Sequence, residues 1–352
     1  MAKFERIQFD PGTWEKTLNG FADRIVFQTP AWLAFVAETQ RGEIVQAALK
    51  EGGETLGYFS GVVVRKFGLK ILGSPFRAWS TPYMGFNLRE GVSRRLAAAA
   101  IADFAFQELG CLHLEVVDAH LQHDEIAGLG FAPQPCATME IDLTQTEDEL
   151  FAGMTKSCRW TVRKAEKNGV IIEPASDPAF ADDYFNQLTD VFAKQSSVPH
   201  IDRERTRALL KHLLPTDHLL LLRARNAAGE CLATGLFPAC NRTAFYWGGA
   251  SWRRHQKLYP NELLQWHAIR YWKQRGITAY NMVGTMDFKQ KFGGRQTEVP
   301  MLVRSKYRWL AYGRTVAPRL ARSALHGIWK VKSLGRKPAA PAAPAENPPA
   351  ED

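Results

Sequence analysis

A chain of 352 residues with 45% apolar residues is long enough to bury more than one hydrophobic core. No apolar run approaches the thickness of a bilayer, and the N-terminus lacks a basic start followed by an apolar stretch; we therefore expect a cytoplasmic protein rather than a membrane-spanning or secreted one. The net charge of +9 is concentrated near the C-terminus, and the five cysteines show no metal-ligand spacing, so we expect reduced thiols and no metal site.

The first half of the chain predicts helices and strands in a clear order. Apolar periodicity and turn residues predict a helix at 31–40, strands at 43–51 and 55–67 around the Gly52-Gly53 turn, a helix at 93–109 and a strand at 112–118. Helices come first, a meander of strands follows, and a further helix leads into one more strand.

The second half predicts the same order. The segments are helices at 178–195 and 202–214, strands at 218–226, 231–240 and 243–251, a helix at 261–275 and a strand at 277–283. The repeated order predicts an α/β protein built from two similar units, each with a mixed sheet. We place the first unit at 1–143 and the second at 144–305.

The C-terminal region differs from both halves. No Asp or Glu occurs from residue 299 to residue 345, whereas ten Lys or Arg residues do. We predict a basic helical segment at 306–337 that packs on the two units, followed by a disordered Pro/Ala tail at 338–352. Apolar residues recur among the basic ones, so the segment could also contact a membrane surface.

A basic helix is predicted at the start of the second unit. Thr144 and Glu147 have capping-box spacing, and Gly169 is suited to end the helix. Its inward stripe is Met154, Cys158, Val162 and Ala165, and its basic face is Lys156, Arg159, Arg163 and Lys167. This face is either solvated or a clamp for phosphate, which the fork of arginine binds in a bidentate manner.

Three blocks resemble one family. The stretch at 148–172, "DELFAGMTKSCRWTVRKAEKNGVII", the stretch at 260–284 and "DFKQKFGG" at 287–294 are similar to blocks of the FemAB-like branch of the GNAT acyltransferase superfamily, in the same order. In the last block Phe288, Lys289, Phe292 and Gly293 match the family's F-K-x-x-F-G signature.

The resemblance implies two GNAT folds in tandem and transfer of an acyl group, acetyl or longer, to an amine or hydroxyl. Relatives act in peptidoglycan, exopolysaccharide and envelope-glycan synthesis. The implied donor is acyl-CoA and the implied acceptor is an anionic small molecule or a lipid-linked glycan precursor. With such an acceptor, the protein would contact the inner membrane face peripherally.

The resemblance also implies roles for individual residues. Lys289 would neutralise the anionic substrate or the charge that develops beside the acyl group, and Gly293 and Gly294 would let backbone and ligand approach. Asp287 and Glu262 are candidate general bases, although either could cap a helix or be solvated.

A second set of basic residues precedes the helix at 261–275. Pro260 suits the first turn of that helix, where free N–H groups attract anions. Arg253, Arg254 and Lys257 could therefore bind a coenzyme A pyrophosphate, or could form a basic surface loop. The sequence lacks the superfamily's Q/R-x-x-G-x-G/A coenzyme A loop.

Two alternatives remain open. One is tRNA-dependent aminoacyl transfer to a peptidoglycan precursor, the only case in which we expect a nucleic-acid partner; where some such relatives carry an acid, this chain has Tyr83. The other is a non-catalytic protein that docks on membrane or polyanion through its basic C-terminus. Several aromatic residues, Tyr83 and Tyr246 among them, could line a groove or form core.

Overall fold

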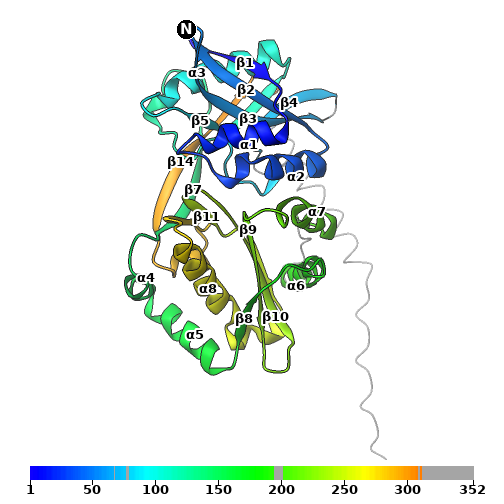
Figure 1. The fold of residues 1–352 in the computed structure, drawn as a ribbon, viewed down its shortest axis with the longest axis vertical. Helices are drawn as coiled ribbons and strands as arrows, with labels where there is room; N and C mark the ends of the chain where they lie inside the picture. Colours follow the sequence, from blue (N-terminus) through cyan, green and yellow to red (C-terminus); the bar gives the residue numbers. More distant parts are fainter. Residues whose placement is uncertain (67, 77–78, 194–200, 308–309, 311–352) are drawn as a thin grey trace, which may run out of the picture. The chain divides into compact units, whose positions relative to one another are not determined.

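The computed structural model describes residues 1–66, 68–76, 79–193, 201–307 and 310 (Figure 1). Contacts group residues 1–304 into one compact unit, and the fold presented below is the fold of that unit. Most of the predicted basic segment at 306–337, and all of the predicted tail at 338–352, lie outside the described residues.

The first half is a β-rich layer with three α-helices. Its elements are β1 (Lys3–Ile7), α1 (Pro11–Asn19), α2 (Pro30–Gln40), β2 (Glu43–Glu51), β3 (Glu54–Lys66), β4 (Leu69–Ser74), β5 (Phe86–Leu88), α3 (Arg94–Asp103), β6 (His113–Val117) and β7 (Gln134–Asp142). Each helix begins where a side chain accepts a hydrogen bond from a free backbone N–H group of the first turn: Asp10 caps α1, Thr29 caps α2 and Ser93 caps α3.

The second half has the same kinds of element. They are α4 (Glu147–Gly153), α5 (Lys156–Lys167), β8 (Ile171–Pro174), α6 (Phe180–Ala193), α7 (Arg203–Leu213), β9 (Leu219–Arg225), β10 (Cys231–Cys240), β11 (Thr243–Phe245), β12 (Gly248–Ser251), α8 (Pro260–Gln274), β13 (Ala279–Asn281), α9 (Asp287–Gln290) and β14 (Arg295–Ser305).

The basic helix predicted from Thr144 toward Gly169 is two helices, α4 and α5. The capping box is formed by Thr146 and Glu149, two residues later than predicted. The helix breaks because Thr155 caps a new helix: its hydroxyl accepts the N–H of Cys158, and its own N–H donates to the Lys291 carbonyl at 3.0 Å. Three residues of the predicted inward stripe, Cys158, Val162 and Ala165, lie on α5 and are buried; the fourth, Met154, is buried at the end of α4.

The two halves repeat one topology. In the first half β4 and β6 are parallel and α3 connects them; in the second half β11 and β13 are parallel and α8 connects them. In each half, the strand that follows the first member of the parallel pair does not join that pair. In the first half β5 pairs with β3, and in the second half β12 pairs with β10. The mixed α/β fold with two similar halves is therefore confirmed.

The last strand of each half pairs within the other half. The sheet order places β14 between β6 and β7, and β7 between β14 and β13. The neighbours β7 and β14 can be followed in Figure 1. β7 is antiparallel to both β13 and β14. One sheet thus runs through both halves, while the division after residue 143, between β7 and α4, stays a prediction.

The two halves also share a hydrophobic core. One cluster of buried side chains draws on both, with Phe27 and Phe245 ring centroids 4.5 Å apart and Trp32 and Trp247 centroids 6.2 Å apart. Aromatic pairs at these separations stabilise beyond the area they bury. Because sheet and core are continuous, the first half can place residues beside the carboxyl ends of β11 and β13.

Candidate functional site

The parallel strands β11 and β13 separate at their carboxyl ends. Their pairing runs from Thr243 opposite Ala279 to Phe245 opposite Asn281, and the N–H of Tyr246 still donates to the Asn281 carbonyl at 2.9 Å. Beyond that point β12 pairs with β10, whereas the chain after β13 bonds to β7 through Met139. In α/β sheets, ligands bind where neighbouring parallel strands diverge in this way.

Lys289 lies at this divergence. The short helix α9 carries it, and the side chain is only 7% exposed. Its Nζ donates to the Val283 carbonyl at 2.5 Å and lies 5.5 Å from the Tyr246 ring centroid. No carboxylate pairs with it among the described residues, and burial lowers the pKa of Lys289 to about 8. The site therefore holds a desolvated amine that titrates near physiological pH.

The turn after β13 has a strained backbone. Val283 is β-branched yet has a φ of 54°, a conformation that costs of the order of 1–3 kcal/mol. Two side chains hold it, because the N–H of Val283 donates to Asn281 Oδ1 at 2.8 Å and the carbonyl accepts from Lys289. Thr138 of β7 completes the network: its hydroxyl donates to Asn281 Oδ1 at 2.8 Å and accepts the Gly284 N–H at 3.1 Å.

The first half contributes the loop between β4 and β5. Its Tyr83 hydroxyl lies 3.5 Å from Asn281 Nδ2, and burial raises the pKa of Tyr83 to about 12, so the phenol stays protonated. The Trp247 indole donates to the Ser80 carbonyl at 2.6 Å. The loop is thus fastened to the carboxyl ends of both parallel strands.

A partly buried arginine faces the same loop. Arg205 of α7 donates from Nη2 to the Trp79 carbonyl and lies over the Phe35 ring, 5.9 Å from its centroid. Its Nε is buried without a hydrogen-bond partner, as is the indole N–H of Trp79, and no carboxylate among the described residues pairs with Arg205. Burial lowers the pKa of Arg205. The donors exceed the acceptors here, which is the arrangement that an anionic ligand would complete.

The signature residues pack as a unit beside Lys289. Phe292 is buried, and Phe288 packs on Phe292 and Tyr246 with centroids 5.4 Å and 6.3 Å away. A Cβ on Gly293 would lie 2.6 Å from the Gly153 carbonyl oxygen, and one on Gly294 would lie 2.8 Å from that of Glu140. The glycines therefore admit neighbouring backbone, as the sequence had suggested, and their predicted role in admitting a ligand stays a prediction.

The two candidate bases occupy different surroundings. Glu262 forms an ion pair with Lys291 at 2.5 Å, which joins the start of α8 to the end of α9. Lys291 is partly buried and lies 4.4 Å from the Phe288 ring centroid. Asp287 is exposed in the first turn of α9. Their catalytic roles stay predictions.

The predicted phosphate ligands do not converge on one point. Arg159 donates from Nη1 to the carbonyls of Ala152 and Met154 and so closes the end of α4, while Arg163 is exposed, 5.1 Å from the Phe151 ring centroid. Arg254 pairs with Glu230 at 2.7 Å. The remaining two lie in the same segment: Arg253 bonds through its backbone N–H to Asp190 at 2.8 Å, and Lys257 is exposed.

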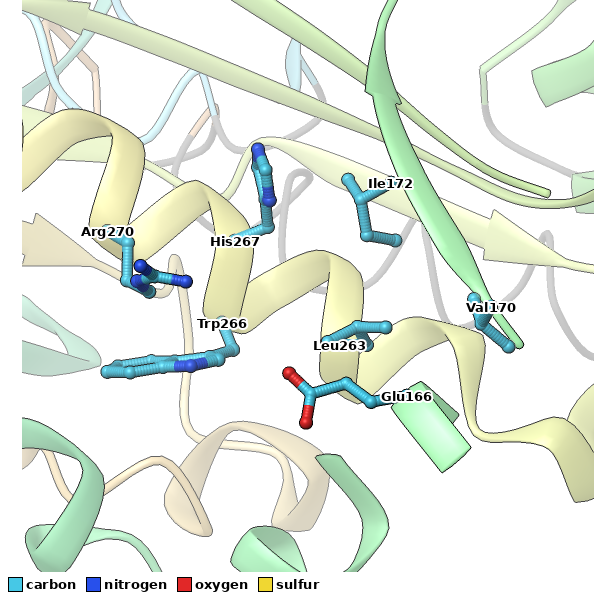
Figure 2. A pocket seen from close by; sticks show the side chains of 7 residues that line it. All are labelled: Glu166, Val170, Ile172, Leu263, Trp266, His267 and Arg270. Atoms are coloured by element: carbon cyan, nitrogen blue, oxygen red, sulfur yellow. The ribbon is translucent and has the colours of Figure 1, made fainter. Parts of the chain in front are cut away.

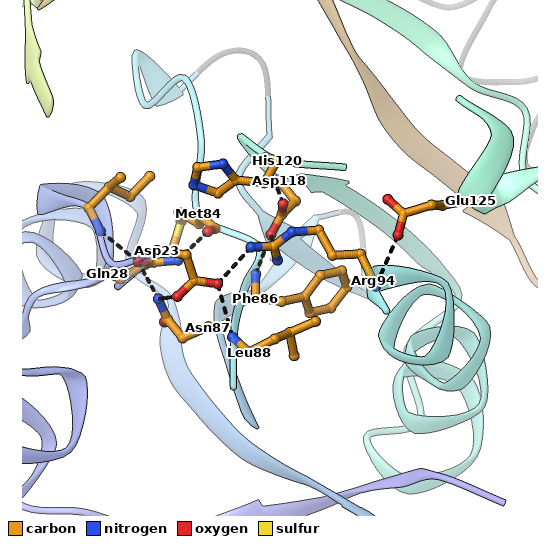
Figure 3. Close-up of polar contacts among 12 residues, drawn as sticks. Asp23, Gln28, Met84, Phe86, Asn87, Leu88, Arg94, Asp118, His120 and Glu125 are labelled. Carbon is orange, nitrogen blue, oxygen red and sulfur yellow. Dashed lines mark hydrogen bonds and ion pairs between the residues drawn. The ribbon is translucent and has the colours of Figure 1, made fainter. Parts of the chain in front are cut away.

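The equivalent position in the first half is closed by its own side chains (Figure 3). At the start of α3, Arg94 pairs with Asp23 at 2.6 Å and with Asp118 at 3.1 Å. Asp118 also accepts the N–H groups of Phe86 and His120. Because these charges satisfy one another, the second half carries the candidate site.

A pocket of about 180 Å³ lies elsewhere, between α5, β8 and α8 (Figure 2). Its lining combines apolar side chains such as Leu263 and Trp266 with Glu166, His267 and Arg270. Burial and the nearby Arg270 lower the pKa of His267, so the imidazole is neutral at physiological pH. None of the predicted site residues lines this pocket.

The residues that sequence reasoning missed are Arg205, Thr138, Asn281 and Val283. Asn281 gave a faint signal, as a polar residue at the end of an apolar strand; the other three lie among arginines, strand residues and valines of ordinary appearance. Tyr246 was considered only as a groove or core residue.

Comparisons with known proteins find a family match for part of the chain and a similar fold for most of it. Residues 153–290 match the family model described as an acetyltransferase (GNAT) domain. Comparison with curated proteins finds no match. Among solved structures, FemX is similar with a TM-score of 0.70 at 14% identity, covering 89% of this chain and 99% of FemX.

Two further structures share the fold at lower similarity. A tandem GNAT protein from the clavulanic acid biosynthesis pathway has a TM-score of 0.52 at 11% identity, over 87% of this chain and 99% of its own. L-PGS from Bacillus licheniformis has a TM-score of 0.55 at 14% identity, over 88% of this chain and 96% of its own. At such identities these likenesses concern the fold alone.

Proposed function

We propose that this chain is a GNAT-type acyltransferase of the FemAB-like branch, and that it transfers an acyl group from a thioester donor to an amine or hydroxyl of a cell-envelope or exopolysaccharide precursor. The match of residues 153–290 to a GNAT domain and the fold shared with FemX and a tandem GNAT protein support this proposal. The observation that carries the proposal is the position of Lys289, which is buried at the divergence of β11 and β13 and pairs with no carboxylate among the described residues. The reaction takes place in the cytoplasm, where such precursors are assembled.

The chemistry follows from what Lys289 can supply. When the neutral acceptor amine attacks the thioester carbonyl, a C–N bond forms and negative charge develops on the carbonyl oxygen. The C–S bond then breaks, the nitrogen loses a proton, and the departing thiolate takes up a proton and leaves as the free thiol. A protonated Lys289 in a desolvated site stabilises that charge more strongly than it would in water. The held turn at Val283 keeps the ammonium in place before the reaction begins.

The donor we favour is acyl-CoA, which supplies its acyl group as a thioester. The start of α8 fits its pyrophosphate: the residue before the helix, Tyr259, makes no side-chain cap, so the first N–H groups are free of a side-chain acceptor, and Lys257 is exposed nearby. Glu262 in the first turn would oppose an anion, but Lys291 neutralises it. Arg254 is held by Glu230 and supports this site less.

The acceptor we favour carries a phosphate or diphosphate. Arg205 offers a partly buried guanidinium without a carboxylate partner, close to the loop that leads to Tyr83. A charge-assisted contact to phosphate at such a position is worth about 1.5–3 kcal/mol.

A donor screen tests the proposed activity. The protein would be incubated with amine or hydroxyl acceptors and either acyl-CoA thioesters or aminoacyl-tRNA. Release of free thiol would be followed for the thioesters, and transfer of labelled amino acid to the acceptor for the aminoacyl-tRNA. Acceptor-dependent thiol release is the expected result. Transfer only from aminoacyl-tRNA would favour the alternative donor, and absence of transfer from every donor would favour the non-catalytic alternative.

Arg205→Met tests the acceptor site without knowledge of the acceptor. We expect it to weaken binding of inorganic pyrophosphate about tenfold or more, measured by calorimetry. Arg207→Met is the matched control, because Arg207 lies on the same helix but is exposed and pairs with Asp182 and Glu204. Equal affinity of the two variants would remove Arg205 from the acceptor site.

A further inference from the structure

The outward face of α5 combines one exposed tryptophan with a cationic stripe. Lys156, Trp160, Arg163 and Lys167 recur at the i, i+4, i+7, i+11 spacing, opposite the buried Cys158, Val162 and Ala165. All four are exposed, and the Trp160 side chain is 55% exposed. Lys164 borders the stripe, and Glu166 lies to one side of it.

The charges of this stripe are free for a partner. No carboxylate among the described residues pairs with Lys156, Arg163, Lys164 or Lys167. Four uncompensated cations around an exposed indole are unusual for a merely solvated face, where acids normally alternate with bases. The indole itself costs free energy in water unless something covers it.

We propose that this stripe docks the protein on an anionic membrane surface. Tryptophan favours the interface between headgroups and acyl chains, and lysine can rest its alkyl stem there while its ammonium meets lipid phosphate. Charge complementarity with an anionic leaflet accounts for the stripe without any precise partner geometry. The stripe consists of other residues than the predicted basic segment at 306–337.

Nucleic acid is another polyanion that could bind this face. The contacts that the arginines already make favour lipid instead. Specific phosphate recognition depends on bidentate hydrogen bonds from arginine. The Arg159 guanidinium already donates to two backbone carbonyls, and that of Arg163 stacks on the Phe151 ring. Trp160 also packs edge-on against Tyr259, with centroids 5.5 Å apart, which limits stacking of a base on the ring. The free groups are mainly lysines, which act as point charges toward a surface.

The stripe adjoins the candidate site. Thr155 at the start of α5 bonds to the Lys291 carbonyl, and Trp160 contacts Tyr259 at the start of α8. A membrane bound at α5 would therefore lie next to α9, the short helix that carries Lys289. This placement suits an acceptor presented at the bilayer surface, but the binding itself does not depend on the proposed activity.

Vesicle partition of the full chain tests the proposal. We expect Lys156→Gln/Lys167→Gln to lower partition onto phosphatidylglycerol-containing vesicles at least tenfold, since each cation near an anionic surface contributes about fivefold. Lys16→Gln/Lys66→Gln removes the same charge from exposed positions of the first half and should change partition little. The C-terminal segment is unaltered in all variants and sets a common baseline.

Trp160 provides an independent readout. Brominated lipid should quench fluorescence in the wild type and quench it less in Trp160→Phe. Equal partition of the two double variants, or quenching unaffected by Trp160→Phe, would overturn the proposal. It would also fail if Lys156→Gln/Lys167→Gln weakened binding of an RNA hairpin while vesicle partition stayed the same, since the stripe would then be a nucleic-acid surface.

Discussion

Lys289→Met is expected to lower turnover roughly 100- to 1,000-fold. The substitution keeps most of the side-chain length and removes a desolvated cation at the divergence of β11 and β13. Loss of a single preorganised stabiliser of developing charge has effects of about this size. The measurement is kcat and KM with the donor and acceptor found in the screen; we expect the loss mainly in kcat.

The pH dependence separates two roles for Lys289. If the ammonium stabilises charge, activity is highest below the pKa of about 8 and falls as pH rises through it, and Lys289→Arg removes that fall. If the neutral amine acts as a base, activity rises through pH 8 instead. Near wild-type turnover of Lys289→Met, with the exposed Lys66→Met as control, would contradict both roles.

Stability provides a control on the same variant. Because burial lowers the Lys289 pKa from 10.5 to about 8, the folded state binds this proton more weakly than the unfolded state. The resulting destabilisation is fully present below pH 8 and disappears above pH 10.5. Lys289→Met should therefore melt no lower than wild type at pH 7, and the difference in Tm should narrow between pH 8 and 10.5. A clearly lower Tm at pH 7 would make the lysine structural.

Gly293→Ala is expected to destabilise the protein by about 3 kcal/mol. Part of this cost is conformational, since Gly293 has a φ of 84°. The larger part is steric, because the new Cβ would lie 2.6 Å from the Gly153 oxygen. To relieve this clash, the backbone at Gly293 or at Gly153 would have to move, which costs free energy. Denaturant unfolding would measure the loss, and turnover should fall as well because this turn positions Lys289.

Gly229→Ala isolates the conformational part. Gly229 has a similar φ of 80°, but nothing lies within 4 Å of its hypothetical Cβ. It should cost only about 1 kcal/mol, as expected for a left-handed residue in open space. Equal losses at the two glycines would mean that the close approach of α9 to the end of α4 is not part of the native packing.

Sequence reasoning predicted much of the fold from local patterns. Apolar periodicity and turn residues indicated the repeated order of elements, and the buried face of α5 was predicted residue by residue. It missed the break at Thr155 because a capping threonine inside an amphipathic pattern looks like continuous helix. It could not foresee that β7 and β14 pair within opposite halves, since pairing partners of distant strands leave no local signal.

The sequence by itself determined the fold class, the repeated order of elements and the signature of phenylalanines and lysine at 288–293. These features depend on the spacing between neighbouring residues. Only the tertiary structure decided which groups form the site. Lys289 became the central residue because packing desolvates it, whereas Lys291 is neutralised by a glutamate 29 residues away. Arg205, Asn281 and Thr138 meet the turn only through the shared sheet and core. Desolvation and ion pairing are properties of three-dimensional surroundings, and residue type does not encode them.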